Sequence, residues 1–278
     1  MPTDTVRASR TPSVSSSLSA FEFAAQLGSA DAPLIVDCRG EEAFSRDQCM
    51  LPAAIRVPIA AVATHVRDNR PVVTYCSEGH ASSQNAASAL RAQGVAARHL
   101  EGGIVAWQAA GLVTVRKRPD FGVPSADGSR WVTRERPKID RIACPWLLRR
   151  FIDPFAHFLY VPTPEVFAVA QREHAVAYDI PGAPIEHDGP RCSFDTLLAA
   201  FDLHDVCLDD LAVIVRGADT AHLELAPQCA GLLAVSLGLS ANFADDHAML
   251  ERGMIVYDAL YGWLKRVHAE THTWSAAP

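Results

Sequence analysis

The sequence predicts two domains: an α/β domain with a parallel sheet flanked by helices, followed by a helix-rich α+β domain. The length of 278 residues favours two domains, at about 100 to 200 residues each. In the first half, short apolar runs alternate with helical patterns, as in strand–helix–strand units. Residues 117–129 are rich in Pro, Gly and small polar residues, so they interrupt both patterns and predict a linker.

Apolar runs predict the strands of the first domain, which we place at residues 17–116. The predicted strands are 33–36, 54–57, 72–75 and 97–100, and the predicted helices are 18–27, 59–66 and 82–93. Because these apolar runs alternate with helices at this spacing, the sheet is expected to be parallel and covered on both faces. Residues 1–16 are rich in Ser and Thr and are expected to form a disordered tail.

Helices dominate the second domain, which we place at residues 130–270. The predicted strands are 131–133, 158–161 and 175–179, and the predicted helices are 208–216, a segment from Pro227, and a long helix from Asp245 to His268. Pro227 suits the first turn of a helix, and Asp245 suits a cap whose carboxylate accepts backbone N–H bonds.

Charge and composition exclude several classes of protein. The net charge is −7, and residues 121–278 alone carry 13 Lys and Arg against 21 Asp and Glu. An acidic chain does not coat nucleic acid, so direct DNA binding is not expected. No apolar run reaches the roughly 18 to 20 residues of a membrane span, and the first 20 residues lack a secretion signal. Seven cysteines without a Cys-x-x-Cys pair are typical of reduced thiols, so we expect a cytoplasmic protein.

Cys76 carries the strongest chemical signal. It follows the predicted strand 72–75 at once, Gly79 permits a tight turn, and a helix opens near Ser82. Open α/β sheets bind ligands at the carboxyl ends of their strands, where the N–H groups of a helix N-terminus favour a thiolate, a persulfide or an oxyanion. The alternative is that Cys76 is a small buried apolar residue. Cys38 and Cys49 lack such surroundings and are expected to be structural.

Residues 76–81, Cys-Ser-Glu-Gly-His-Ala, resemble the active loop of the rhodanese family, a Cys-x-x-Gly pattern between a strand and a helix. Ile-Val-Asp-Cys-Arg at 35–39 is similar to the Asp-x-Arg of that family, and Leu-Glu-Gly-Gly at 100–103 with Trp107 is similar to its closing motif. The resemblance covers residues 17–112 and implies sulfur transfer without a cofactor. Cys76 would take a sulfane sulfur from a small anionic donor such as thiosulfate, hold it as a persulfide and pass it to a thiol acceptor.

The resemblance also implies roles for the neighbours of Cys76. The anion-binding loop would comprise Ser77, Glu78, Gly79, His80 and Ala81, with Asp37 and Arg39 as its supports. His80 would tune the charge of the loop. The family commonly has Arg, Ser or Thr where this chain has Ala81, and Glu78 adds a negative charge near the donor. Ser82 stands where the related Cys-x5-Arg phosphatases have arginine, so a bidentate phosphate clamp is absent.

A basic segment in the second domain predicts an anion site. Residues 130–150 hold seven Lys and Arg around Cys144, within an otherwise acidic half. Arg134, Lys138 and Arg141 are the candidate ligands of an anion. The alternative is a solvated basic face that pairs with the acidic remainder of the domain.

The long helix near the end of the chain suggests a metal site. His247, Glu251 and Asp258 share one stripe at helical spacing. His247 and Glu251 could therefore bind one divalent metal ion, with His187 or Asp219 completing a mixed nitrogen and oxygen ligand set. The alternative is a polar stripe that is exposed or hydrogen-bonded.

Four segments of the second half resemble the C-terminal domain of the ChrB chromate-resistance family: residues 131–153, 187–195, 214–219 and 245–261. The resemblance covers nearly all of residues 130–265 and implies a link to chromate sensing and resistance. Members often join this domain to a DNA-binding half, whereas this chain has the rhodanese-like half instead. Three hypotheses follow: a sulfurtransferase-like enzyme in chromate or oxyanion resistance, a non-enzymatic oxyanion or metal sensor with a redox-responsive Cys76, and a scaffold.

Overall fold

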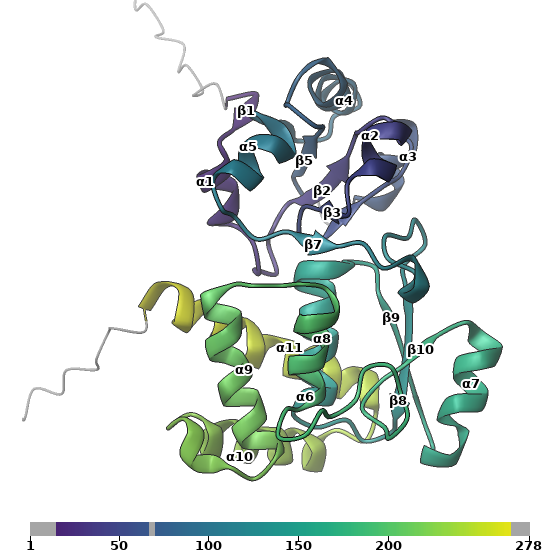
Figure 1. Ribbon diagram of the computed structural model, residues 1–278, viewed down its shortest axis with the longest axis vertical. Helices are drawn as coiled ribbons and strands as arrows, with labels where there is room; N and C mark the ends of the chain where they lie inside the picture. Colours follow the sequence, from purple (N-terminus) through teal and green to yellow (C-terminus); the bar gives the residue numbers. More distant parts are fainter. Residues whose placement is uncertain (1–14, 67–69, 268–278) are drawn as a thin grey trace, which may run out of the picture.

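The computed structural model describes residues 15–66 and 70–267, and it confirms an α/β domain followed by a helix-rich domain (Figure 1). The first domain contains a five-stranded parallel sheet in the order β1-β6-β5-β2-β4. Its strands are β1 (Ser17–Leu18), β2 (Leu34–Asp37), β4 (Ala54–Ile55), β5 (Val72–Tyr75) and β6 (Ala97–Leu100). The four predicted strands are present within one or two residues, and β1 is an unpredicted edge strand.

The segment predicted as one helix over 18–27 begins instead with β1 and continues as a shorter helix, α1 (Ala20–Ala24). The cause is a capping box. The Ser19 hydroxyl accepts the N–H of Glu22 at 3.3 Å, and the Glu22 carboxylate accepts the N–H of Ser19 at 3.0 Å. The helix therefore starts after Ser19, and Leu18 stays extended to pair with Leu100.

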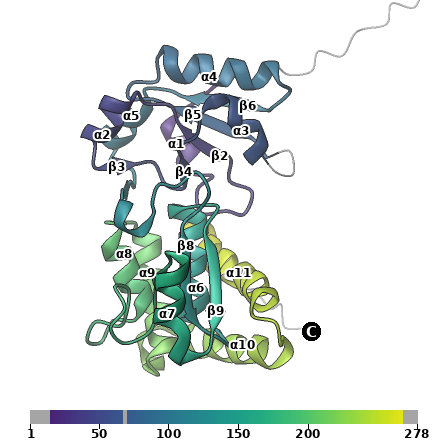
Figure 2. The same ribbon diagram turned by 90° about the vertical axis from the view of Figure 1, so that its right-hand side faces the viewer.

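Both faces of this sheet are covered, as the apolar strands predict. The helices are α1, α2 (Glu41–Arg46), α3 (Ile59–His65), α4 (Ala81–Ala92) and α5 (Gly103–Ala109). On one face, Ile35 and Val73 pack with Phe23 of α1 and Trp107 of α5. On the other face, the alternate strand residues pack with side chains of α3 and α4. Figure 2 shows α4 on the side of the sheet away from the second domain.

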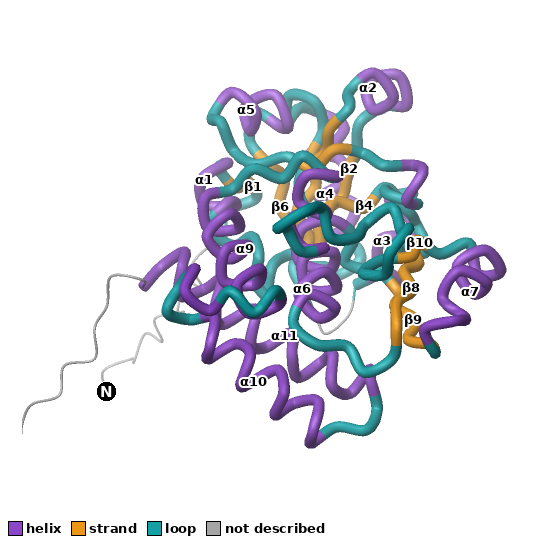
Figure 3. Tube along the Cα trace, turned by 60° about the horizontal axis from the view of Figure 1, so that its bottom comes forward, coloured by secondary structure: helices purple, strands orange, loops and turns teal. Residues whose placement is uncertain are grey.

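The second domain is built around a three-stranded parallel sheet in the order β10-β8-β9. Its strands are β8 (Arg130–Arg134), β9 (His157–Val161) and β10 (Val176–Ala177), and its helices are α6 (Asp140–Leu147), α7 (Val166–Glu173), α8 (Ser193–Ala200), α9 (Val206–Asp219), α10 (Cys229–Asn242) and α11 (Asp246–Gly262). Val132 packs with α7, whereas the neighbouring Trp131 packs in the large core formed by the other helices. The strands thus separate α7 from the helical bundle (Figure 3).

One predicted helix of this domain is shifted, since the helix placed at Pro227 begins at Cys229. The long helix is capped by Asp245, whose carboxylate accepts the N–H of Ala248 at 2.7 Å, as predicted. After α11 the chain continues as a π-helical turn, Trp263–Val267. The predicted end at His268 lies outside the described residues.

The segment that joins the domains is packed rather than free. Strand β7 (Val115–Arg116) pairs antiparallel with β3 (Cys49–Met50) of the first domain. Phe121 and Val123, inside the predicted linker, are buried in the same core cluster as Met50 and the helices of the second domain. The two domains therefore share part of one hydrophobic core.

Polar contacts join the domains as well. The N–H of Ala53 donates to the carbonyl of Phe151 at 2.6 Å. The Lys265 ammonium, just beyond α11, donates to the carbonyl oxygens of Ala24 and Leu27 at 2.9 and 3.0 Å. None of the helices in residues 15–66 and 70–267 combines the length and apolar composition that crossing a bilayer requires.

Candidate functional site

Cys76 lies at the carboxyl end of β5, the central strand of the five-stranded sheet, and its loop leads directly into α4. Gly79 has a φ of +73°, which a residue with a Cβ atom rarely adopts. A Cβ atom there would also lie 2.6 Å from the N of Gly102. Gly79 therefore makes the tight turn that the sequence predicts.

Main-chain N–H groups at the start of α5 form hydrogen bonds with the Cys76 loop. The N–H groups of Ile104 and Val105 donate to the carbonyl oxygens of Cys76 and Ser77, both at 3.0 Å. Gly103 has a φ of +57°, and a Cβ atom on it would overlap the carbonyl oxygen of Cys76 and lie 2.6 Å from that of Ser77. The Gly-Gly motif thus lets a helix N-terminus bind the loop carbonyls.

Hydrogen bonds surround the Cys76 sulfur. The side chain is buried, and its Sγ lies 3.3 Å from the Ser83 Oγ. Burial raises the pKa of this thiol, but the Ser83 hydroxyl and the main-chain N–H groups of Ser83, Glu78 and His80 outweigh burial and lower the pKa below its ordinary value. The arrangement therefore favours a thiolate.

Charged side chains lie at the exposed rim of this loop. The His80 Nδ1 is 3.2 Å from the Glu78 carboxylate, and both side chains are largely exposed. The two side chains thus contact each other within the loop. Ala81 is the first residue of α4 and is exposed, and Ser77 is half-buried.

Asp37 and Arg39 form a buried ion pair behind the loop, with the Arg39 Nη2 donating to the Asp37 Oδ2 at 2.6 Å. The hydroxyl of Tyr75 donates to the same carboxylate oxygen at 2.6 Å. Arg39 also donates to Asp47 and to the carbonyl of Cys49. This network connects the ends of β2 and β5, from which the loop of Cys76 begins.

The residues predicted as an anion site in the second domain are partly engaged by a carboxylate. Arg134 and Arg141 both contact Asp179, at 2.8 and 3.1 Å. Arg141 also donates to the carbonyl oxygens of Arg134 and Glu135. Lys138 is half-buried in the loop before α6. Two of the three predicted cations are therefore bound to Asp179.

A group with metal-ligand chemistry lies beside these arginines. Ligand atoms of Asp140, His187 and Asp219 all lie within 4.8 Å of one another. The His187 Nε2 is 3.3 Å from Asp140, 3.2 Å from Asp219 and 3.4 Å from Asp179. Asp140 is the first residue of α6 and Asp219 the last residue of α9, whereas His187 lies in the loop before α8.

Electrostatics in this group favours bound protons. Burial raises the pKa of Asp140 and of Asp219, and neighbouring carboxylates add to the effect. The hydrogen bond to Asp140 is the main cause that raises the pKa of His187 to about 9. Asp179 forms ion pairs with Arg134 and Arg141. For Asp140 and Asp219, the only ion-pair partner in the described part of the chain is His187.

His247 and Glu251, which we predicted to bind a metal ion together with His187 or Asp219, do not belong to this group. Glu251 is exposed and binds Arg149 at 2.7 Å, and the His247 ring packs against the Tyr160 ring with centroids 5.3 Å apart. Asp258, on the same helix, binds Arg150. The polar stripe of α11 is thus used for contacts within the domain.

Sequence reasoning missed Asp140, a member of the group, and Asp179, which contacts His187. No spacing along one helix could find them, because the group is assembled from separate helices and loops. Asp140 opens α6 only three residues after Pro137, and Asp179 has a φ of +51° at the end of the short β10. The strand predicted over 175–179 ends at Ala177, which leaves Asp179 in the loop that faces His187.

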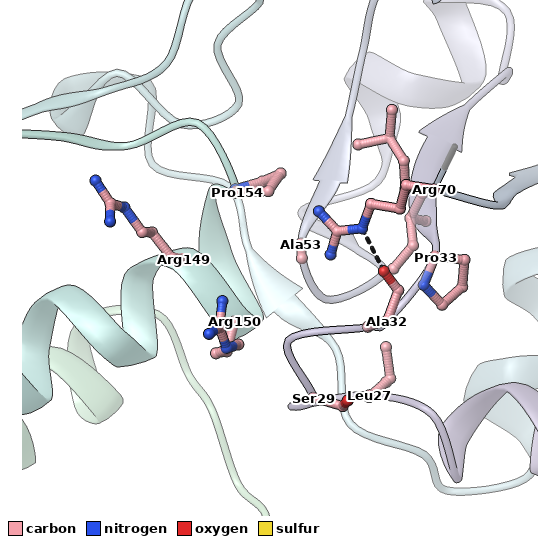
Figure 4. Close-up of a pocket in the computed structure, with 11 residues that line it drawn as sticks. Leu27, Ser29, Ala32, Pro33, Ala53, Arg70, Arg149, Arg150 and Pro154 are labelled. Atoms are coloured by element: carbon pink, nitrogen blue, oxygen red, sulfur yellow. Dashed lines mark hydrogen bonds between the residues drawn. The ribbon is translucent and has the colours of Figure 1, made fainter. Parts of the chain in front are cut away.

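A pocket between the domains is lined by three arginines, Arg70, Arg149 and Arg150 (Figure 4). Arg149 binds Glu251 and Arg150 binds Asp258. The Arg70 guanidinium donates to the carbonyl of Ala32, which Figure 4 marks with a dashed line. The wall of the pocket also includes Ala53, whose N–H donates to the carbonyl of Phe151 across the domain boundary. Each of these arginines therefore binds a partner within its own domain.

Comparison with known families defines the two halves. Residues 19–110 match the rhodanese-like domain, and residues 131–264 match the C-terminal domain of ChrB. The chain thus joins a rhodanese-like domain to a ChrB C-terminal domain. Protein ChrB of Cupriavidus metallidurans is 38% identical over 136 residues, which cover 48% of this chain and 40% of that protein. The chain therefore spans less than half the length of this relative.

Solved structures similar to the first domain include two rhodanese-like proteins. A rhodanese-related protein from Thermoplasma volcanium is 21% identical to this chain, with a TM-score of 0.31. The matched region covers 36% of this chain and 98% of the Thermoplasma chain. A rhodanese-like domain protein from Staphylococcus aureus is 25% identical with a TM-score of 0.29, and covers 34% of this chain and 91% of that chain.

Proposed function

We propose that this protein is a sulfurtransferase-like enzyme that moves sulfane sulfur through a Cys76 persulfide in a chromate or oxyanion resistance context. The observation that carries the proposal is the environment of the Cys76 sulfur. Its pKa is lowered by the Ser83 hydroxyl and by main-chain N–H groups, at the carboxyl end of the central strand. The rhodanese-like match supports sulfur chemistry, and the ChrB match supports the resistance context.

The reaction needs only groups that the loop provides. The Cys76 thiolate attacks the outer sulfur of thiosulfate, the S–S bond breaks, and sulfite leaves with the bonding electron pair. The loop N–H groups of Glu78 and His80 then face the charge of the persulfide. An acceptor thiolate attacks the outer sulfur, and Cys76 returns to a thiolate.

Sulfur transfer from thiosulfate to cyanide tests this proposal. We expect turnover in the full chain and its loss in Cys76→Ala, because the attacking sulfur is removed. Cys49→Ala is a matched control, since Cys49 is a partly exposed thiol of the same domain. Turnover that is unchanged in Cys76→Ala would overturn the assignment.

For the second domain we propose a divalent cation site formed by Asp140, His187 and Asp219. This site would also suit the alternative function, a metal or oxyanion sensor with a redox-responsive Cys76. The buried Asp140 and the half-buried Asp219 share one imidazole, with ligand atoms within 4.8 Å of one another. A divalent cation would replace the protons that this group otherwise binds. Oxygen and nitrogen ligands of this kind suit Mn²⁺, Fe²⁺ and Zn²⁺.

Equilibrium dialysis of the full chain against Mn²⁺ and Zn²⁺ tests the cation site. Asp140→Asn and His187→Gln should each weaken binding by roughly tenfold or more, whereas Glu251→Gln and His247→Gln should not. Because the cation competes with the proton on His187, affinity should rise with pH and level off near the His187 pKa of about 9. Weaker binding in the α11 variants alone would instead support the site predicted from helical spacing.

A further inference from the structure

Cys38 occupies the position beside Cys76 in the sheet. The parallel pairing of β2 with β5 runs to Asp37 opposite Tyr75, and the residue that follows each strand is a cysteine. The N–H of Cys38 donates to the carbonyl of Tyr75 at 2.7 Å, so the pairing holds up to this point. Neighbouring strands lie about 4.8 Å apart, which falls within the Cα separations of roughly 4.4 to 6.8 Å that a disulfide spans.

The two side chains also point to the same face. Side chains alternate along a strand, so Cys38 shares the face of Val36, and Cys76 shares the face of Thr74. Val36 and Cys38 pack in the cluster beneath α4. Cys76 contacts Ser83 of that helix, and the Thr74 hydroxyl donates to the carbonyl of Ser83 at 2.7 Å. Both thiols therefore lie at the ends of neighbouring strands, on the face of the sheet that α4 covers.

Cys38 is a thiol rather than a thiolate in this environment. Burial is the main cause that raises its pKa to about 12, and the negative charges of Asp37 and Cys76 add to the effect. The Cys38 Sγ donates weakly to the carbonyl of Val36, at 3.6 Å. A protonated neighbour does not compete with Cys76 for the incoming sulfur donor.

We propose that Cys38 is a resolving thiol, which attacks the persulfide of Cys76 and releases its outer sulfur as hydrogen sulfide when no acceptor arrives. This role rests on the proposed sulfur transfer. The Cys38 sulfur forms a bond to the Cys76 sulfur, and the bond between Cys76 and the outer sulfur breaks. The outer sulfur leaves with the electron pair and takes up the Cys38 proton. Two thiol-level sulfurs are oxidised to a disulfide, and the sulfane sulfur is reduced to sulfide.

The product is an enzyme in which Cys76 is blocked until an external thiol reduces the disulfide. The step is slow at neutral pH because Cys38 keeps its proton, and it speeds up as pH rises. An acceptor thiol that arrives early leaves Cys38 unused. Cys38 thus sets how long the persulfide survives without an acceptor.

Sulfide release from the loaded full chain tests this role. The reduced protein is treated with thiosulfate, desalted, and followed for free sulfide and for intact mass. Wild type and Cys49→Ser should lose the added sulfur as sulfide and become two hydrogens lighter than the reduced protein. Cys38→Ser should keep the one-sulfur adduct, with sulfide release slower by roughly tenfold or more. The adduct on Cys38→Ser itself shows that its loop is folded.

Equal rates of sulfide release in Cys38→Ser and wild type, or a disulfide that maps to another cysteine, would overturn the role of Cys38. Absence of any adduct would refute the proposed sulfur transfer and, with it, the persulfide step. The pairing of the two thiols has its own test in that case. One equivalent of hydrogen peroxide converts the Cys76 thiolate to a sulfenic acid, and a resolving Cys38 condenses with it to a disulfide and water. Sulfinic acid at Cys76 with Cys38 still reduced contradicts the pairing.

Discussion

At the scale of single residues, Ser83 decides the state of the Cys76 sulfur more than any charged side chain does. Its hydroxyl and its N–H group both lower the pKa of Cys76, whereas the exposed Glu78 and His80 side chains pair with each other. The pKa of Cys76 is therefore lowered by uncharged groups of the loop and of α4. The sequence predicted the roles of Cys76 and Gly79, because Cys76 follows a strand and Gly79 permits a tight turn. No sequence pattern pointed to a role for Ser83.

Replacement of Ser83 by alanine should raise the pKa of Cys76, because it removes the hydroxyl that lies 3.3 Å from the sulfur. Alkylation by iodoacetamide, measured against pH, should show the titration moved upward, with each pKa unit lowering the rate at neutral pH about tenfold. Ser82→Ala is the control, because Ser82 is exposed and neighbours Ser83 in sequence. An unchanged titration in Ser83→Ala would show that the main-chain N–H groups alone set the pKa.

At the scale of elements, the strands and helices place residues that are distant in the sequence next to one another. Apolar runs predicted β2, β4, β5 and β6, because a parallel strand buried on both faces has a distinctive composition. The capping box at Ser19 and the positive φ of Asp179 changed element boundaries that periodicity alone could not place. Helical spacing grouped His247 with Glu251, whereas the structure brings Asp140, His187 and Asp219 together, because spacing along one helix gives a stripe but not the residues that face it.

Gly103→Ala tests the contact between α5 and the Cys76 loop. A Cβ atom at Gly103 would overlap the Cys76 carbonyl, so we expect displacement of the loop, loss of sulfur transfer, and a loss of stability well above about 1 kcal/mol. Gly111→Ala is the matched control, since Gly111 has a similar φ of +68° with open space around it. Activity that survives in Gly103→Ala to the same degree as in Gly111→Ala would argue against the role of the Gly-Gly motif.

At the scale of the whole molecule, the two domains are held together by more than their connection. The composition of residues 117–129 predicted a linker, yet Phe121 and Val123 are buried with residues from both halves. Pro, Gly and small polar residues mark the absence of regular structure, and they do not show whether a segment packs. Contacts across a domain boundary depend on tertiary packing, which a single sequence does not encode locally.

Lys265→Met should weaken the packing of the two domains. The ammonium donates to the carbonyl oxygens of Ala24 and Leu27, and its loss leaves these oxygens without that partner. We expect the free energy of unfolding to fall by about 1 to 3 kcal/mol in chemical denaturation. Arg266→Met is the control, because Arg266 is exposed and adjacent. Equal stabilities of the two variants would mean that this contact contributes little.

The central claim is that the Cys76 sulfur accepts and holds a sulfane sulfur. Intact-mass measurement of the full chain, immediately after thiosulfate treatment and desalting, tests it most directly. We predict a species heavier by one sulfur atom, which a reductant removes and which is absent in Cys76→Ser. A wild-type mass without added sulfur, or an adduct that persists in Cys76→Ser, would contradict the claim.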